Sequence, residues 1–192
     1  MADILVLYYS RNGATASLAR AIATGVDSVA GMSARLRTVP TVSANTEAVE
    51  DAVPESGPPY VSSRDLEECA GSVMGSPTHF GNMAAPLKYC VDYSRGEWLR
   101  GTLAGTPCAT FASTGSLHGG QETTLLSMAI PLRHHGMIFV GVPYTEEALS
   151  TTMSGGTPSG PTHVTWNREN DALSDDEKTL AHALGARVAD IA

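Results

Sequence analysis

Residues 4–26 read ILVLYYSRNGATASLARAIATGV, and this stretch decides the fold class. Its first part, Ile4 to Tyr9, is an apolar run without alternation, which is typical of a strand buried on both faces of a parallel sheet. The run stops at the polar turn Ser10 to Gly13. Apolar residues then recur at helical spacing, at Leu18, Ile22, Val26 and Val29. A buried strand, a tight turn and an amphipathic helix form the first half of a β-α-β unit.

The rest of the chain repeats this pattern. Four further strands are expected, at residues 34–39, 72–76, 108–112 and 137–142. Helices are expected to begin at Ser62 to Asp65, near Met83, at Glu122, and at the capping box Ser174 to Glu177. Pro131 should kink the third of these or end it early. Five strands that alternate with helices predict an open parallel sheet of the α/β class, with helices on both faces and strand order 2-1-3-4-5.

Two segments interrupt this alternation. Residues 40–62 are rich in proline and small polar side chains, and residues 143–171 combine proline, glycine and threonine. Both are expected to be long loops. Because the sequence shows no internal repeat and no linker between two cores, residues 1–192 predict a single domain.

Composition excludes several classes of function. The formal charge of −8 argues against binding to nucleic acid or to anionic membranes, which both require basic surface. The longest apolar run is far shorter than the roughly 20 residues of a membrane span, and the N-terminus lacks the features of a signal peptide, so we expect a cytoplasmic location. The three cysteines form no CxxC pair, and the adjacent His134 and His135 lack a metal-ligand partner at helical spacing. We therefore expect inert thiols and no metal site.

Ligands of such sheets bind outside the carboxyl ends of the strands. In this chain those ends are the loops Ser10 to Thr15, Ser76 to Asn82 and Ser113 to Gln121, which are rich in hydroxyls, amides and glycine and contain no acid. The first loop precedes a helix, so its backbone N–H groups could hold a phosphate, with Ser10, Asn12 and Thr15 as added donors. The alternative interpretation is a plain turn with a hydroxyl cap.

The other two loops also leave alternatives open. Phe80 in the second loop is either an aromatic wall of a site or a plug in the core, and the third loop either presents N–H groups to a planar ring or is an exposed connection.

The sequence contains no GxGxxG, no GxxxxGK[ST] and no GxSxG. This absence argues against a Rossmann dinucleotide site, a P-loop and a hydrolase nucleophile, and favours a bound monophosphate.

At these loops the sequence resembles the WrbA family of flavodoxin-like NAD(P)H:quinone oxidoreductases. The resemblance rests on five segments in the family's order, namely LVLYYSRNG (5–13), GSPTHFGNM (75–83), FASTGSLHGGQE (111–122), LRHHGM (132–137) and GGTPSG (155–160). It implies a flavodoxin-like fold, FMN as bound cofactor, NADH or NADPH as co-substrate, and a homodimer or homotetramer with FMN sites near the subunit interfaces.

The resemblance also implies roles for single residues. The FMN phosphate would be held by Ser10, Arg11, Asn12, Gly13, Ala14 and Thr15. The isoalloxazine ring would lie along Pro77, Thr78, His79 and Phe80. Its pyrimidine side would meet Ser113, Thr114, Gly115, Ser116, Leu117, His118 and Gly119. His134 would also reach the flavin, and Trp98 and Asn12 would contact substrate. Asn12, His79 and the longer 116–120 loop depart from the family pattern, which leaves the choice between NADH and NADPH open.

The implied activity is a ping-pong reaction in which NAD(P)H delivers a hydride to FMN, and a quinone then takes the place of the nicotinamide and receives two electrons. The flavin carries the chemistry, so no side chain is needed as a catalytic nucleophile. The alternative from another class is a flavodoxin-type FMN electron carrier that acts with a protein partner. A third hypothesis, a regulatory protein that binds protein or DNA, is disfavoured by the charge of −8.

Overall fold

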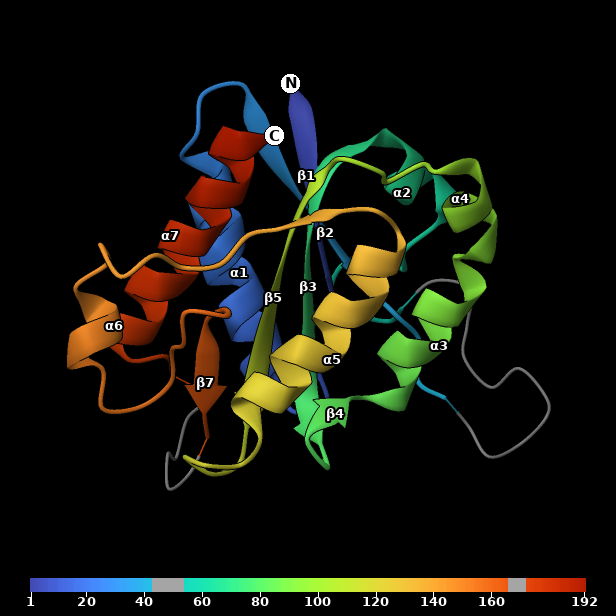
Figure 1. The fold of residues 1–192 in the computed structure, drawn as a ribbon. Coiled ribbons are helices and arrows are strands. Elements are labelled where there is room, and N and C mark those ends of the chain that lie inside the picture. Colours follow the sequence, from blue (N-terminus) through green and yellow to red (C-terminus); the bar gives the residue numbers. More distant parts are fainter. Residues whose placement is uncertain (43–53, 166–171) are drawn as a thin grey trace.

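The computed structural model describes residues 1–42, 54–165 and 172–192. Its centre is a seven-stranded sheet whose main path is parallel and follows the order β2-β1-β3-β5-β6 (Figure 1). The strands of this path are β1 (Ala2–Tyr8), β2 (Met32–Thr38), β3 (Cys69–His79), β5 (Pro107–Thr114) and β6 (Ile138–Phe139). When the short hairpin strand β4 (Asn82–Met83) is set aside, this is the predicted order 2-1-3-4-5.

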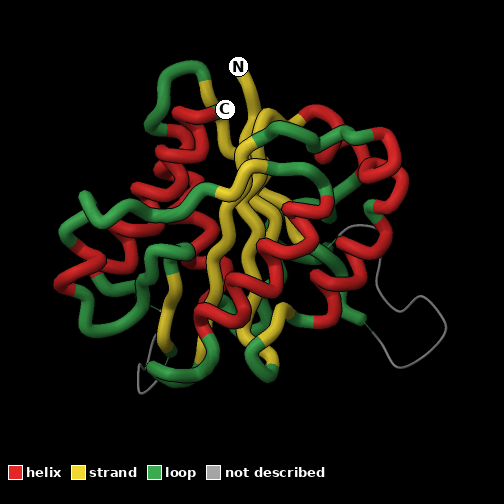
Figure 2. The backbone as a smooth tube through the Cα atoms, in the orientation of Figure 1, coloured by secondary structure: helices red, strands yellow, loops and turns green. Residues whose placement is uncertain are grey.

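Helices cover both faces of the sheet, as predicted (Figure 2). One face carries α1 (Ala14–Asp27) and α7 (Asp175–Ile191). The other carries α2 (Ser63–Glu68), α3 (Ala85–Tyr93), α4 (Arg95–Arg100) and α5 (Gln121–His134). Within β1 the side chains alternate between two cores, because Ile4 and Val6 pack with α1 and α7 while Leu5 and Leu7 pack with the opposite helices. Because helices cover both faces of β1, its sequence is apolar throughout and does not alternate between apolar and polar residues.

The two helices on the first face approach each other closely. A Cβ atom added to Gly25 would lie 2.0 Å from the carbonyl oxygen of His182, and one added to Gly185 would lie 2.2 Å from that of Ile22. Only glycine allows backbone-to-backbone contact at these two positions. The amino-terminal capping box of α7 is confirmed, with the amide of Glu177 donating to Ser174 Oγ over 3.2 Å.

The fifth strand of the fold comes from two separate segments. The first half of β5 pairs with β6, in the register Pro107 to Ile138, whereas its second half pairs with β7 (Thr162–Val164). The strand predicted at 137–142 is therefore wrong in its second half. After β6 the chain leaves the sheet, and the amide of Val142 donates to the carbonyl of Pro158 over 3.0 Å. Because β5 still needs backbone partners at its carboxyl end, β7 takes the vacated place.

Three other differences from the sequence prediction concern local structure. Pro131 neither ends α5 early nor prevents it from reaching His134, because the helix is held by core side chains such as Leu125 and Met128. Residues 95–100, which the sequence left without a structure, form α4. The predicted long loop 143–171 contains α6 (Ala148–Thr151) as well as β7.

The insertion before α2 returns to the sheet at its edge. The amide of Thr38 donates to the carbonyl of Pro59, and the amide of Val61 donates to the carbonyl of Thr38.

The parts of the two predicted loops at 43–53 and 166–171 lie outside the described residues. Within the described ranges no helix is long and apolar enough to cross a membrane.

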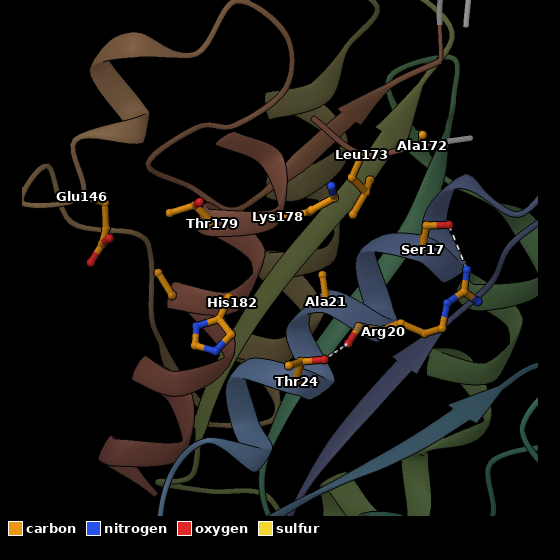
Figure 3. Close-up of a pocket in the computed structure, with 11 residues that line it drawn as sticks. Ser17, Arg20, Ala21, Thr24, Glu146, Ala172, Leu173, Lys178, Thr179 and His182 are labelled. Carbon is orange, nitrogen blue, oxygen red and sulfur yellow. Dashed lines mark hydrogen bonds between the residues drawn. The ribbon is translucent and has the colours of Figure 1, made fainter. Parts of the chain in front are cut away.

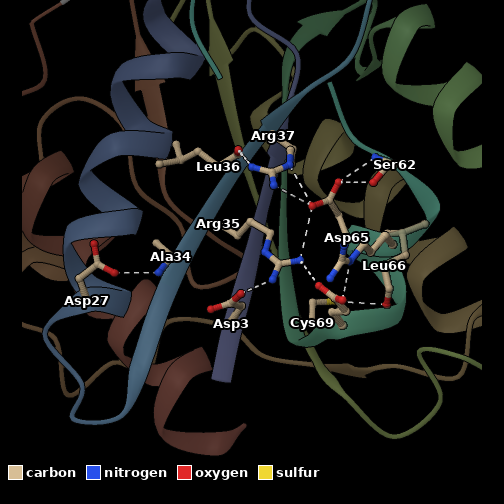
Figure 4. A network of polar contacts seen from close by, with 12 residues as sticks. Asp3, Asp27, Ala34, Arg35, Leu36, Arg37, Ser62, Asp65, Leu66 and Cys69 are labelled. Carbon is tan, nitrogen blue, oxygen red and sulfur yellow. Dashed lines mark hydrogen bonds and ion pairs between the residues drawn. The ribbon is translucent and has the colours of Figure 1, made fainter. Parts of the chain in front are cut away.

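An ion-pair network fixes α2 against the edge strand (Figure 4). Arg37 donates to Asp65 at 2.9 Å, and Arg35 pairs with Asp3, with Glu68 at 3.1 Å and with Asp65. Burial alone would raise the pKa of Asp65, but hydrogen bonds from Ser62 and the guanidinium of Arg37 outweigh it and lower the pKa. The carboxylate therefore stays charged and joins the amino terminus of α2 to β2.

The three thiols are free and protonated. Cys69 and Cys108 are buried and Cys90 is half-buried. Burial raises the pKa of Cys69 and of Cys90 to about 11 and that of Cys108 to about 12. Because the thiolate is the reactive form, these cysteines are inert near neutral pH.

Candidate functional site

The three polar loops meet at one edge of the sheet. They follow β1, β3 and β5, which are adjacent and parallel, so their carboxyl ends point the same way (Figure 1). Residues 10–15, 76–82 and 113–121 are thereby brought together from three distant parts of the chain. This edge is where a doubly wound sheet binds its ligand.

The first loop forms a backbone nest at the start of α1. Gly13 has a left-handed φ of 95° and is the N-cap of the helix. Ser10 Oγ accepts hydrogen bonds from the amides of Gly13 and Ala16, at 3.2 and 3.3 Å. The amides of Ala14 and Thr15, also in the first turn, have no acceptor in the described part of the chain. Unpaired donors at the positive end of a helix dipole are suited to a phosphate.

Two hydroxyl pairs tie the loops to one another. Thr15 Oγ1 and Ser113 Oγ are 2.8 Å apart and buried, which joins the first loop to the third. Thr124 Oγ1, in the first turn of α5, donates to Thr78 Oγ1 over 3.1 Å, which joins the second loop to the helix after the third. The loops therefore form one connected polar site.

The third loop is shaped by its own hydrogen bonds. Thr114 Oγ1 donates to the carbonyl of Ser116 over 2.9 Å, and the buried amide side chain of Gln121 donates to the same carbonyl over 3.3 Å. Leu117 and His118 are exposed at the tip. The alternative interpretation of the third loop as an exposed connection is therefore correct only for its tip, because the base of the loop is held by hydrogen bonds.

Phe80 in the second loop is fully exposed. It has a φ of 54°, in the left-handed region that residues with a side chain rarely adopt. The interpretation of Phe80 as a core plug is therefore wrong. Such a conformation costs on the order of 1 kcal/mol and is concentrated at ligand sites. An exposed aromatic ring in a strained turn beside the polar loops could cover a planar ligand.

Trp98 and His134 lie at the other end of the fold. The indole Nε1 of Trp98 donates to the backbone carbonyl of His134 over 2.8 Å, so the two residues touch each other. His134 is the last residue of α5, and the 14 residues of this helix span about 21 Å. Because α5 starts at the edge with the loops and runs away from it (Figure 1), one chain does not bring these two residues to the loops.

The donor set of the loops fits FMN. It consists of backbone N–H groups, hydroxyls and amide side chains, and residues 10–15, 76–82 and 113–121 include no carboxylate that would repel a phosphate. The side chains that would fix the phosphate loop, those of Ser10, Thr15 and Ser113, are already positioned by hydrogen bonds. Among the described residues no group of three His, Cys, Asp or Glu side chains could hold a metal ion.

Sequence reasoning missed a buried hydrogen-bonded pair next to this site. His163 in β7 and Glu177 in α7 are both 0 % exposed, and His163 Nδ1 lies 2.9 Å from Glu177 Oε2. His163 is the register partner of Ser113. Burial would raise the pKa of Glu177, but hydrogen bonds, that with His163 above all, lower it to about 2. The only sequence signal was the capping box, which accounts for Glu177 and not for His163.

An open groove of about 940 Å³ lies elsewhere, over α1 and α7 (Figure 3). It holds none of the predicted site residues. Its basic side chains have partners, since Arg20 donates to Ser17 Oγ over 2.9 Å and Lys178 pairs with Asp175 at 3.2 Å. Both long cationic side chains of this groove therefore already have a partner within the chain.

Comparison with known proteins identifies the family. Residues 3–147 match the family described as NADPH-dependent FMN reductase. A protein of Trichlorobacter lovleyi named NAD(P)H dehydrogenase (quinone) is 40 % identical, over 100 % of this chain and 97 % of the relative. A protein of the same name from Solidesulfovibrio magneticus is 38 % identical, over 98 % of this chain and 97 % of the relative.

Solved structures agree on the fold. The flavodoxin, WrbA-like protein from Agrobacterium tumefaciens superposes with a TM-score of 0.71 at 21 % identity, and covers 100 % of this chain and 97 % of that one. A flavodoxin from the domain Archaea superposes with a TM-score of 0.63 at 18 % identity, over 98 % and 96 % of the two chains. The flavodoxin-like fold inferred from the sequence is thus confirmed, and so is the relation to proteins named NAD(P)H dehydrogenase (quinone). The protein belongs to the NADPH-dependent FMN reductase family.

Proposed function

We propose that this protein is an FMN-dependent NAD(P)H:quinone oxidoreductase. The observation that carries the proposal is the acid-free set of donors at the carboxyl edge of the sheet, where Thr15 and Ser113 join two loops through a 2.8 Å hydrogen bond. The names of the relatives, NAD(P)H dehydrogenase (quinone), supply the class of substrate. The family match supplies the flavin.

The chain's own groups position the reactants. The amides of Ala14 and Thr15, which have no acceptor among the described residues, would hold the phosphate, and Ser10 would keep the nest in shape. Residues 77–80 and 113–119 flank the ring, with Phe80 as an exposed aromatic surface. When bound, FMN supplies the hydride and two-electron chemistry that side chains lack. N–H groups of the third loop would stabilise the negative charge of a reduced flavin ring. A nicotinamide and a quinone would use this same site in turn, as a ping-pong reaction requires.

The active unit of this proposal is an oligomer in the cytoplasm, where NAD(P)H is available. Trp98 and His134 lie about 20 Å from the loops of their own chain, so they reach a flavin only in a neighbouring subunit. Exposed apolar side chains of α3 and α5, on the face of the sheet that also carries Trp98 and His134, support such contacts between subunits. Among them are Tyr89, Tyr93 and Ile130. We expect a homodimer or homotetramer, which sedimentation of the FMN-loaded protein would measure.

Anaerobic absorption spectroscopy tests the function. The protein is reconstituted with FMN, reduced with NADH or NADPH in separate samples, and then mixed with benzoquinone. We expect the flavin bands to bleach with a nicotinamide and to return with the quinone, without any partner protein. Bands that no nicotinamide bleaches, but that a chemical reductant does, would favour the flavodoxin-type electron carrier. A protein that does not retain FMN would refute both functions.

A further inference from the structure

Gln121, the first residue of α5, lies at the base of the third loop and is only 5 % exposed. The tip of the loop, with Leu117 and His118, is exposed. Gln121 Nε2 donates to the carbonyl of Ser116 over 3.3 Å and to the carbonyl of Leu117. Carbonyl oxygens only accept hydrogen bonds, so the nitrogen of the side-chain amide must be the atom that faces them. Its two N–H groups match the two carbonyls.

Further contacts hold the first of these two carbonyls. The carbonyl of Ser116 also accepts from Thr114 Oγ1 at 2.9 Å and from the amide of Gly119 at 3.1 Å. A Cβ atom added to Gly119 would lie 2.9 Å from the same carbonyl oxygen, so the turn closes tightly around it. For the carbonyl of Leu117, Gln121 is the one donor among the described residues. Gln121 therefore fixes one peptide group of the tip and helps to fix the peptide group before it.

The two carbonyls determine where the amides of the tip point. In a trans peptide unit the C=O of one residue and the N–H of the next residue point in opposite directions. Because the carbonyls of Ser116 and Leu117 face the buried Gln121, the amides of Leu117 and His118 point away from it, toward the outside of the fold. Neither amide has an acceptor in the part of the chain that the structure describes. Successive free N–H groups in a loop are suited to an acceptor that carries negative charge.

We propose that Gln121 is a positioning residue that aims the amides of Leu117 and His118 at the ring of bound FMN and thereby makes the flavin easier to reduce. The proposal rests on the proposed function and deepens it. Hydride transfer from NAD(P)H adds two electrons and one proton to FMN, so the reduced ring carries one more negative charge than the oxidised ring. Donors whose positions are fixed in advance stabilise that added charge. Gln121 acts through the loop and does not itself touch the flavin.

A purely structural role for Gln121 leads to a different expectation. If Gln121 only kept the loop folded, its loss would weaken the binding of oxidised and reduced FMN by the same factor, and the midpoint potential of the bound flavin would not change. Hydrogen bonds to a charged acceptor are roughly twice as strong as those to a neutral one. Loss of the aimed amides should therefore weaken the binding of reduced FMN more than that of oxidised FMN. The midpoint potential distinguishes the two roles.

Reductive titration of the FMN-loaded protein against a reference dye tests the proposal, for wild type, for Gln121→Met and for the control Thr123→Val. Methionine is uncharged and similar in length to glutamine, but it cannot donate a hydrogen bond. Thr123 is exposed in the same first turn of α5, and its Oγ1 donates to the carbonyl of Gly120 over 3.1 Å. The control therefore removes a hydrogen bond from this turn without affecting the carbonyls of the loop tip.

The expected result is a selective loss of affinity for the reduced cofactor. In Q121M the dissociation constant of reduced FMN should rise about tenfold more than that of oxidised FMN. This ratio lowers the midpoint potential by about 30 mV, because a tenfold change corresponds to that value for a two-electron couple. T123V should keep the potential of wild type.

A second measurement uses wild type alone, so it does not depend on the folding of a variant. In nitrogen-15 NMR spectra the amide protons of Leu117 and His118 should move downfield when FMN binds, and again when the bound FMN is reduced. Resonances that do not respond to reduction, an unchanged potential in Q121M, or an equal shift in T123V would overturn the role of Gln121 and leave the proposed function intact. Wild-type protein that binds no FMN would instead overturn the proposed function, and this proposal with it.

Discussion

Replacement of Glu177 by glutamine should remove a large part of the protein's stability. Glutamine keeps the size of the side chain, but its NH₂ group faces donors where a carboxylate oxygen accepted them. The pKa of Glu177 falls from its ordinary value of 4.5 to about 2, after burial, which raises it, is outweighed by hydrogen bonds from His163 and the backbone. A shift of this size corresponds to about 3 kcal/mol of stabilisation at neutral pH. We expect E177Q to lose about that amount.

The sign of the pH dependence follows from the direction of the shift. A carboxyl group with a lowered pKa in the folded state stabilises the fold fully above its unfolded value, and the contribution is lost as the pH falls. The difference between wild type and E177Q should therefore be constant above about pH 5 and should shrink as the pH falls from 4.5 toward about 2.

Urea unfolding followed by circular dichroism measures the effect across this range. Asp175→Asn is the matched control, because it removes a carboxylate from the same helix turn, but an exposed one. We expect its unfolding midpoint to stay close to that of wild type. E177Q as stable as wild type at pH 7, or a difference that persists unchanged at low pH, would refute the reasoning.

Three further changes probe other parts of the fold. Asp65→Asn should lower the free energy of unfolding by about 1–2 kcal/mol at neutral pH, since the charged carboxylate ties α2 to the edge strand; the loss should fade as the pH falls below 3.8, and a loss that does not fade would contradict this. Gly185→Ala should lower the melting temperature, because the added Cβ would lie 2.2 Å from the carbonyl oxygen of Ile22, and this clash outweighs a gain of about 1 kcal/mol in helix propensity. A raised melting temperature would show that α1 and α7 can separate. Thr15→Val and Ser113→Ala should each weaken FMN binding, and a double-mutant cycle on the FMN dissociation constants should give a coupling of about 1 kcal/mol; strictly additive effects would mean that the hydroxyl pair does not act as a unit.

Local patterns in the sequence were enough for much of the fold. The uninterrupted apolar run of β1 already implied burial on both faces, and the structure places its alternate residues in two cores. Ser62 with Asp65, and the capping box at Ser174, marked helix starts, because capping depends on residues only three positions apart. The three loops also followed from the sequence, since a loop inherits its place from the strand before it.

Features that depend on distant pairing were not visible. β7 has three residues and no periodicity, and it becomes a strand only because β5 has free backbone groups once the chain leaves at Val142. Pro131 was expected to kink α5 or end it early, and the helix nevertheless continues to His134, with Leu125, Met128 and Leu132 buried in the core.

The same division applies to the site. Hydroxyl and glycine residues in three loops indicated a phosphate ligand, because the chemistry of donors can be read from residue types. Their connection through Thr15 and Ser113, and the position of Trp98 at the opposite edge, were decided by the tertiary structure. His163 shows the reason most clearly. A histidine among threonines carries no signal of its own, and its buried position depends on a strand register and on a carboxylate 14 residues later, which only the folded chain brings within 2.9 Å.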